Sequence, residues 1–235
     1  MDIVKLHATG STNEALRSRF RESELPHFTC LYALAQSEGK GQQQAQWESE
    51  PYKNLTFSIL ITETKDYSHP FELNQIVAVS LAEWLESRLK IQARIKWPND
   101  ILSVRHKLAG ILVENFFSGL NHTHSIVGIG LNVNQTHFQY APKAISLSLL
   151  TGNSFVLEEL LISFLEHLKR NLERPKEVKN LYHQYMFKYL QFTQFEDADG
   201  GFEAKVLGTD EQGQLLLERE GKIQRYDLKS LRWLY

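Results

Sequence analysis

The sequence changes its pattern near residue 190, and this change restricts the folds that the chain can adopt. Before it, apolar runs of strand length alternate with helical patterns such as residues 72–90, whose apolar side chains recur at amphipathic intervals. After it, short strands are separated by turn signals rich in glycine and acidic residues. The sequence therefore predicts an α+β main domain over residues 1–188 and a small β-barrel of SH3-like size over residues 189–235.

Within the main domain, the first helix is predicted to start at Ser11, because Ser11 and Glu14 form an S-x-x-E capping pattern. The segment containing His122 and His124 is predicted to be an exposed loop, since no acid or cysteine is spaced to complete a metal site with them. Further strands are predicted at 29–36, 55–61, 91–97, 100–104, 107–117 and 125–134, and further helices at 72–90, 156–173 and 176–190.

The composition and charge of the chain argue against several classes of protein. The net charge of −2 over 235 residues, with lysine and arginine spread along the chain, argues against broad nucleic-acid binding. No apolar stretch approaches the ~18 residues that a membrane span needs. Cys30 is the only cysteine, and no secretory signal is visible at the N-terminus. We therefore expect a cytoplasmic protein without nucleic-acid or membrane partners.

The segment KWPNDILSVRHKLAGILVEN, residues 96–115, is the strongest candidate for chemistry. Lys96 and Lys107 flank a Pro-Asn-Asp corner, and a lysine at the start of a strand holds its ammonium in a fixed direction. Asp100 could orient Lys96 or hold a divalent cation, and Gly110 leaves room for a ligand. The alternative is that both lysines are surface charges and Asp100 only forms the turn. The agreement among these residue types favours an anion-binding hairpin.

Three other segments offer polar groups, each with a structural alternative. Residues 39–47, GKGQQQAQW, follow a strand and could close over a phosphate-bearing ligand, or could be a solvent loop. Ser11 to Asn13 could bind a ligand, or Ser11 could simply cap the helix. Asn132, after a glycine pair, could face a ligand or end a buried strand.

These motifs together resemble the biotin–protein ligases, a family that also includes the holocarboxylase synthetases. The match runs over nearly the whole chain, and the most specific part is KWPND with KLAGILVE beginning eleven residues after its lysine. The resemblance implies a class II synthetase-like mixed β-sheet with flanking helices, followed by an SH3-like β-barrel. The motifs, in chain order, are STN at 11–13, GKGQQQAQW at 39–47, KWPNDI at 96–101, KLAGILVE at 107–114 and GIGLNV at 128–133.

The resemblance also implies a reaction and its participants. Biotin would be activated with ATP and Mg²⁺ to biotinyl-5′-AMP, and then transferred to a lysine of a biotin carboxyl carrier domain. Lys107, Lys96 and Asp100 would be catalytic, with Asp100 near the magnesium. The implied biotin-binding residues are Ser11, Thr12, Asn13, Gln36, Lys40, Gly41, Gln42, Lys107 and Gly110, and the implied adenylate-binding residues are Lys40, Trp47, Asn99 and Asn132.

Two departures from the family stand out. The loop is typically G-R-G-R-x-G-R-x-W, whereas here Gln42 replaces an arginine, Gln44 replaces a glycine, and Lys40 is the only charged residue. We therefore expect weaker retention of biotinyl-AMP. Because STN starts at residue 11, we also expect no N-terminal DNA-binding domain and no repressor role. The family contains monomers and homodimers, and the sequence leaves both open.

Two other functions remain open at this stage. A lipoate–protein ligase or octanoyltransferase would have a similar fold, but KWPND and the SH3-like tail favour biotin, and Cys30 comes too early to be the octanoyltransferase nucleophile. An inactive biotin-binding or carrier-binding module would explain the altered loop, but Lys107, Asp100 and the STN group are all present.

Overall fold

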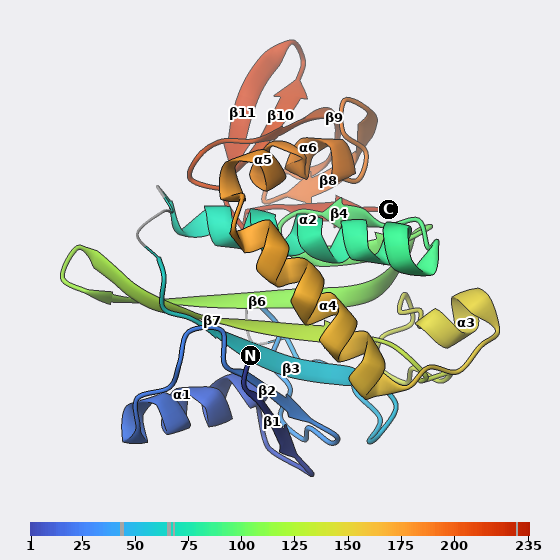
Figure 1. Ribbon diagram of the computed structural model, residues 1–235. Coiled ribbons are helices and arrows are strands. Elements are labelled where there is room, and N and C mark those ends of the chain that lie inside the picture. The colour runs from blue at the N-terminus through green and yellow to red at the C-terminus, as the bar shows by residue number, and fades with distance from the viewer. Residues whose placement is uncertain (43–44, 65–66, 68, 229) are drawn as a thin grey trace.

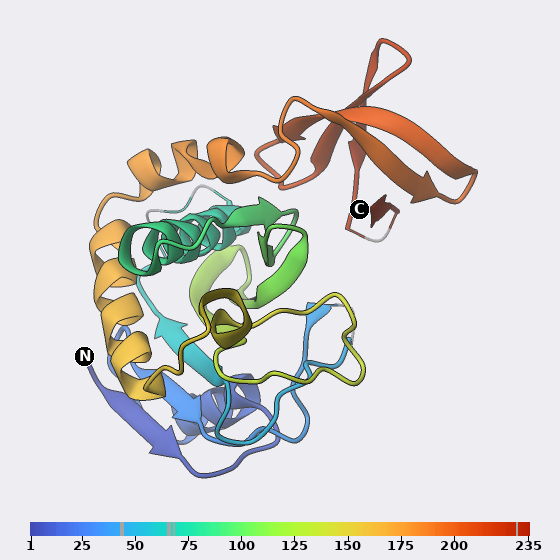
Figure 2. The ribbon, with the colours of Figure 1, turned by 90° about the vertical axis from the view of Figure 1, so that its right-hand side faces the viewer.

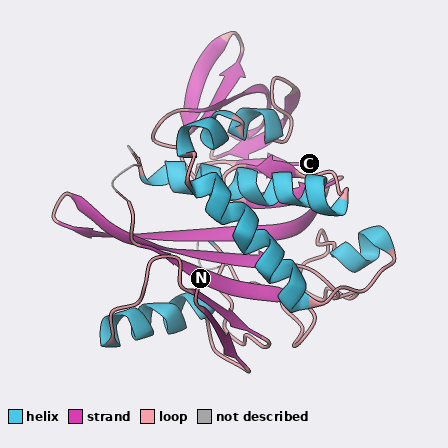
Figure 3. Cartoon of the chain, in the orientation of Figure 1, coloured by secondary structure: helices cyan, strands magenta, loops and turns pink. Residues whose placement is uncertain are grey.

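The computed structural model contains two β-sheets connected by helices, and it describes residues 1–42, 45–64, 67, 69–228 and 230–235 (Figures 1 and 3). The large sheet has the order β1-β2-β3-β7-β6-β5-β4, with β1 and β2 parallel and the other neighbours antiparallel. The predicted mixed sheet is thereby confirmed. Its strands are β1 Ile3–Leu6, β2 Cys30–Ala33, β3 Leu55–Ile61, β4 Arg94–Lys96, β5 Asp100–Ser103, β6 His106–Ser118 and β7 Asn121–Leu131.

Helices α2 and α4 cover one face of this sheet (Figures 1 and 2). The predicted helix at 72–90 exists, but it is not the simple amphipathic helix that we expected. It is buried on several sides, because it lies between the sheet and the outer helices α4 and α5. The helices are α1 Thr12–Glu22, α2 Pro70–Leu89, α3 Leu147–Thr151, α4 Leu157–Leu172, α5 Pro175–Asn180 and α6 Tyr182–Tyr185.

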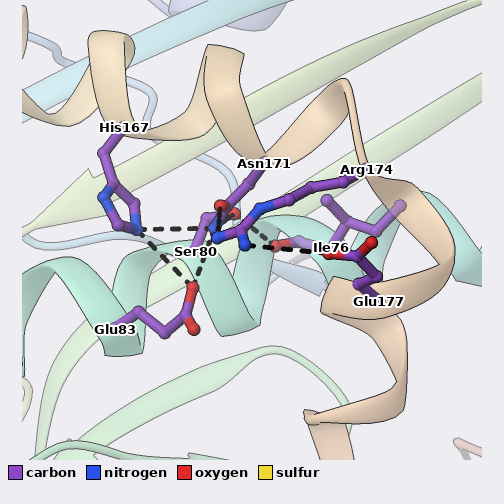
Figure 4. Close-up of polar contacts among 7 residues, drawn as sticks. All are labelled: Ile76, Ser80, Glu83, His167, Asn171, Arg174 and Glu177. Carbon is purple, nitrogen blue, oxygen red and sulfur yellow. Dashed lines mark hydrogen bonds and ion pairs between the residues drawn. The ribbon is translucent and has the colours of Figure 1, made fainter.

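A network of polar side chains fastens α2 to α4 (Figure 4). Asn171 of α4 is buried, and its Nδ2 donates to Ser80 Oγ at 3.0 Å and to Glu83 Oε2 at 2.9 Å. Arg174 Nη2 donates to Asn171 Oδ1 at 3.0 Å. Burial lowers the pKa of His167 next to this network, although Glu83 opposes that shift. The helix layer is therefore held in register by directional bonds as well as by apolar packing.

Helix α1 packs on β2, β3 and β7 through a second, smaller apolar core. This core contains Leu16 of α1 and Leu31, Leu60 and Ile126 of the sheet, separate from the residues under α2. Strand β3 is buried along its whole length because both of its faces are covered. The start of α1, with the STN residues, is consequently fixed against the sheet.

The C-terminal part forms a five-stranded antiparallel sheet with the order β11-β10-β9-β8-β12, which projects beyond the main sheet (Figure 2). It agrees with the predicted fold class. Trp97 Nε1 donates to Gly213 O at 2.9 Å, which fastens this sheet to the main domain. The boundary between residues 188 and 189 stays a prediction. The strands are β8 Phe192–Asp197, β9 Gly200–Thr209, β10 Leu215–Arg219, β11 Lys222–Tyr226 and β12 Arg232–Leu234.

Two predicted elements were wrong in detail. The helix predicted at 176–190 consists of the short helices α5 and α6, because Met186 leaves the helix to pair with Ile95 next to β4. His122 and His124 do not lie in a loop but in β7, which forms a long hairpin with β6. Each histidine stacks on a phenylalanine of β6, and burial lowers the pKa of both. None of the helices in the described ranges is long and apolar enough to cross a membrane.

Candidate functional site

A cavity of about 950 Å³ lies between the main sheet and the C-terminal sheet. Its lining combines the start of α1, the loop after β2, the β4–β5–β6 hairpins and residues of the C-terminal sheet. The structure therefore brings together segments that are far apart in the sequence. The sequence-predicted residues in the lining are Ser11, Thr12, Asn13, Gln36, Lys40, Gly41, Gln42, Trp47, Lys96, Asn99, Asp100, Lys107 and Gly110.

Asp100 lies between the two lysines of the KWPND–KLAG segment. Lys107 Nζ is 2.7 Å from Asp100 Oδ1, and Lys96 Nζ is 3.4 Å from Asp100 Oδ2. The β4–β5 register places Lys96 opposite Asp100, and the β5–β6 register places Asp100 opposite Gly110. With one carboxylate between two ammonium groups, the cluster keeps a positive charge and is suited to an incoming anion.

Backbone and amide hydrogen bonds hold the corner that carries this cluster. Asn99 Nδ2 donates to Ile111 O at 2.6 Å, and Ile111 N donates back to Asn99 O at 2.9 Å. Asn74 Nδ2 of α2 donates to Pro98 O at 2.8 Å. Because the donor group of Asn99 is already engaged, this residue fixes the hairpin in addition to lining the cavity.

The start of α1 differs from the expected capping box. Ser11 is the N-cap residue, but its side chain makes no capping hydrogen bond, so the predicted capping by Ser11 was wrong. Gln36 Oε1 instead accepts from Thr12 N at 3.0 Å, and Glu14 pairs with Lys40 of the loop. The helix end is therefore stabilised from the neighbouring loop, which leaves the Ser11 hydroxyl without a capping role.

The described part of the loop after β2 folds back on itself. Trp47 N donates to Gly39 O at 2.8 Å, and Gly41 N donates to Ala45 O at 2.6 Å. The fold places the Trp47 ring over the sheet, where Lys107 Nζ lies 5.4 Å from the ring centroid. The predicted departure at Gln44, together with Gln43, lies outside the described residues.

Two glycines of β7, Gly128 and Gly130, were not predicted as site residues from the sequence. A Cβ at Gly130 would lie 2.4 Å from Trp47 Cε2, and one at Gly128 would lie 2.3 Å from Asn13 Oδ1. Both glycines line the cavity. The available signal was the G-I-G spacing, because residues two apart in a strand point to the same face.

Asn132 is the one predicted site residue that does not line the cavity. It is buried directly after the end of β7. Its Nδ2 donates to Ile145 O at 3.1 Å, and its backbone N donates to Leu108 O at 3.0 Å. In the described structure its Oδ1 is buried and has no hydrogen-bond partner. Its assignment to the adenylate stays a prediction.

The C-terminal sheet contributes a wall that the sequence did not reveal. Tyr235 places its ring 5.0 Å from Lys96 Nζ and 4.5 Å from Lys143 Nζ. Burial is the main reason why the pKa of the Tyr235 hydroxyl is raised, and the nearby Asp100 adds to the shift. The cavity lining from this part of the chain does not include Tyr235 itself but consists of Glu196, Asp197, Ala198, Asp199, Tyr226, Leu228, Ser230, Leu231, Arg232 and Trp233.

The fold and the cavity define a class of enzyme that joins cofactor acids to proteins, and comparison with known proteins agrees. Residues 6–132 match the biotin/lipoate A/B protein ligase family. This match covers more than half of the chain, so the chain belongs to that family.

Individual relatives narrow the comparison within the family. The chain is 27% identical to the bifunctional ligase/repressor BirA of Bacillus spizizenii, over 92% of this chain and 69% of that protein. It is 27% identical to the biotin–[acetyl-CoA-carboxylase] ligase of Mycobacterium tuberculosis, over 63% of this chain and 54% of that one. The structure matches the biotin protein ligase of Aquifex aeolicus in complex with biotin and ATP, with a TM-score of 0.81, 28% identity and 99% coverage of both chains.

Proposed function

We propose that this chain is a biotin–protein ligase that uses ATP. In the first step, the biotin carboxylate attacks the α-phosphorus of ATP, giving biotinyl-5′-AMP and pyrophosphate. In the second step, a lysine amine of an acceptor protein attacks the acyl carbon, and AMP leaves. The observation that carries the proposal is the cavity in which the cationic pair of Lys96 and Lys107 faces the polar start of α1.

The lysine pair suits the first step because two anions must approach one another there. The carboxylate of biotin and the phosphates of ATP repel, and fixed ammonium groups offset this repulsion and stabilise charge that develops in the transition state. Lys107 lies within contact of Gly110 and Trp47, so an anion bound to it would rest on the sheet. The chemistry thus depends on positioning and electrostatics.

Magnesium fits this site as a partner of the nucleotide. Mg²⁺ is commonly held by one or two carboxylates together with substrate phosphates and water. Asp100 is the carboxylate that would hold the ion. Its oxygens would become available when phosphate oxygens replace them as the partners of Lys96 and Lys107. The described residues contain no cluster of three or more His, Cys, Asp or Glu side chains that could hold a metal ion. When bound, the ion would neutralise phosphate charge.

The remaining assignments extend the proposal. Thr12, Asn13 and Gln36 would contact the biotin ring, and Trp47 would pack beside the adenylate. The acceptor would be a biotin carboxyl carrier domain of a carboxylase, and the protein would act in the cytoplasm. The proposal accommodates either a monomer or a homodimer.

The decisive experiment is pyrophosphate release by the purified protein with ATP, Mg²⁺ and biotin, lipoate or octanoate. We expect release with biotin alone, and its loss in Lys107→Ala. The matched control is Lys222→Ala, which removes an exposed lysine on β11 outside the cavity. Release only with lipoate or octanoate would move the protein to another activity of the same family, and no release with any acid would indicate a binding module.

A further inference from the structure

Behind the wall of the cavity, a chain of hydrogen bonds runs from Arg17 to Thr12. Arg17 Nη2 is paired with Glu114 Oε1, and Asn13 Nδ2 donates to Glu114 Oε2 at 2.7 Å. Ser58 Oγ lies 2.6 Å from Asn13 Oδ1 and 2.8 Å from Thr12 Oγ1. Thr12 and Asn13 line the cavity, whereas the other three residues do not. This series of hydrogen bonds therefore connects the Arg17–Glu114 ion pair, outside the cavity, with the Thr12 hydroxyl, which lines it.

Proton counting fixes the direction of every bond in this chain. An ionised carboxylate only accepts hydrogen bonds, so Glu114 requires the Nδ2 side of the Asn13 amide. The Oδ1 side then faces Ser58, whose single proton must go to it because an amide oxygen has none to give. Because the Ser58 proton is used in this way, Ser58 Oγ can only accept a hydrogen bond from Thr12. The Thr12 hydroxyl proton therefore points at Ser58 Oγ. The Thr12 oxygen consequently faces the cavity as an acceptor.

The surroundings leave little freedom to reverse this order. Ser58, at the centre of the hydrogen-bond chain, is 0% exposed and does not line the cavity, so bulk water cannot replace either of its partners. The Asn13 amide lies directly on the sheet, where a Cβ at Gly128 would approach its Oδ1 to 2.3 Å. Arg17 itself lies over the Phe116 ring at 5.1 Å, which helps to keep the guanidinium against Glu114.

We infer that Glu114, held by Arg17, is a positioning residue that fixes Thr12 as a hydrogen-bond acceptor and so selects acids whose ring carries N–H donors. This inference rests on the proposed function and deepens it. The ureido ring of biotin has two such donors, whereas the dithiolane ring of lipoate and the alkyl chain of octanoate have none. If the hydrogen bonds ran in the opposite direction, the Thr12 proton would point into the cavity. It would then face an N–H donor of the ligand, and no hydrogen bond could form between the two donors.

The variant Glu114→Gln tests the inference because a carboxamide has one oxygen. Arg17 can only donate, so it takes that oxygen, and the new amide nitrogen faces Asn13. The Asn13 amide must then turn round, and the whole chain reverses. We expect biotin, measured by titration calorimetry, to bind about tenfold more weakly, since one hydrogen bond of the ligand loses its partner. The KM for ATP and the melting temperature should remain close to those of the unchanged protein.

A second substitution separates this role from general damage. Adding Arg17→Met to Glu114→Gln frees the carboxamide oxygen for Asn13, so the original order returns and biotin affinity should recover. Arg17→Met alone keeps the carboxylate and should change the affinity less than about threefold. A merely structural role of Glu114 would not be rescued by removing its partner. If Glu114→Gln did not fold, Ser58→Ala, which breaks the chain at its centre, should weaken biotin binding instead.

The outcomes are distinct. Unchanged biotin affinity in Glu114→Gln, or no recovery in the double variant, would overturn the inference while leaving the ligase function intact. Failure of the unchanged protein to bind biotin would overturn the proposed function and the inference with it. Weakening by Glu114→Gln together with recovery on adding Arg17→Met would support both.

Discussion

The carboxylate of Asp100 lies 2.7 Å from the ammonium of Lys107, and its second oxygen faces Lys96 at 3.4 Å. The Asp100 side chain is only 15% exposed, so its charge acts in a poorly solvated setting. This arrangement keeps both lysines aimed at the cavity before an anion arrives. Preorganised charges of this kind need little rearrangement during a reaction.

Asp100→Asn should therefore impair activation more than folding. The substitution keeps the shape of the side chain but removes the charge that orients both lysines. We expect biotin-dependent pyrophosphate release to fall about a hundredfold, as for the loss of other preorganised groups. Initial rates over a series of Mg²⁺ concentrations would measure it. Asp2→Asn, at an exposed position far from the cavity, is the matched control, and equal rates in the two variants would contradict this role.

Gly130→Ala should displace Trp47 from the sheet. A Cβ there would come within 2.4 Å of the indole, a distance at which one group must move. We expect the KM for ATP to rise about tenfold, equivalent to about 1.4 kcal/mol of lost binding. Gly201→Ala is the control, since its added Cβ would meet only Phe195 O at 3.8 Å. An unaltered KM in Gly130→Ala would show that Trp47 does not contribute to nucleotide binding.

Gln42→Arg should lengthen the lifetime of bound biotinyl-AMP. Gln42 lines the cavity at the position where the resembled loops carry arginine, and a charge-assisted bond to phosphate is stronger than one from a neutral amide. We expect the release of free adenylate to slow several-fold, as timed after rapid removal of excess biotin and ATP. Gln191→Arg adds the same charge at an exposed position outside the cavity. The idea fails if both variants release adenylate at the original rate.

His183 should make stability fall in acid. Burial lowers its pKa, and its Nε2 accepts from Thr209 N at 3.0 Å, which requires the unprotonated ring. A lowered folded-state pKa gives stability that is complete above the unfolded value of about 6.5 and is lost as the pH falls through the folded value. The melting temperature should thus drop between pH 7.5 and pH 5, by a smaller amount in His183→Gln, whose amide oxygen can also accept. Equal drops in both proteins would contradict this account.

Asn171→Ala should loosen the helix layer. The change removes the hydrogen bonds that Asn171 Nδ2 donates to Ser80 Oγ and to Glu83 Oε2 (Figure 4). Glu83 then keeps its contact with His167 but loses the amide donor between the helices. We expect a loss of about 1–3 kcal/mol in the free energy of unfolding, the range for unsatisfied buried polar groups. Urea unfolding would measure it. Asn153→Ala, at an exposed position, is the control, and a loss below about 0.5 kcal/mol in Asn171→Ala would show that the network contributes little.

The sequence by itself determined the order of the elements and the chemistry of most of the cavity. Strand β3 and helix α2 could be predicted because apolar spacing is a local property, readable within about 20 residues. The proximity of the two lysines to Asp100 could be predicted because their hairpin is also local, with both registers set by the residues between them. The family resemblance rested on the same short segments.

Only the tertiary structure decided what meets across these segments. The direction in which Asn13 presents its amide depends on Glu114, 101 positions away, and no local pattern records such a contact. The burial of α2, the pairing of Met186 with Ile95 and the ring of Tyr235 beside Lys96 likewise follow from how separate elements pack. Local spacing fixes which face of an element is apolar, whereas its partner is chosen by packing over the whole chain.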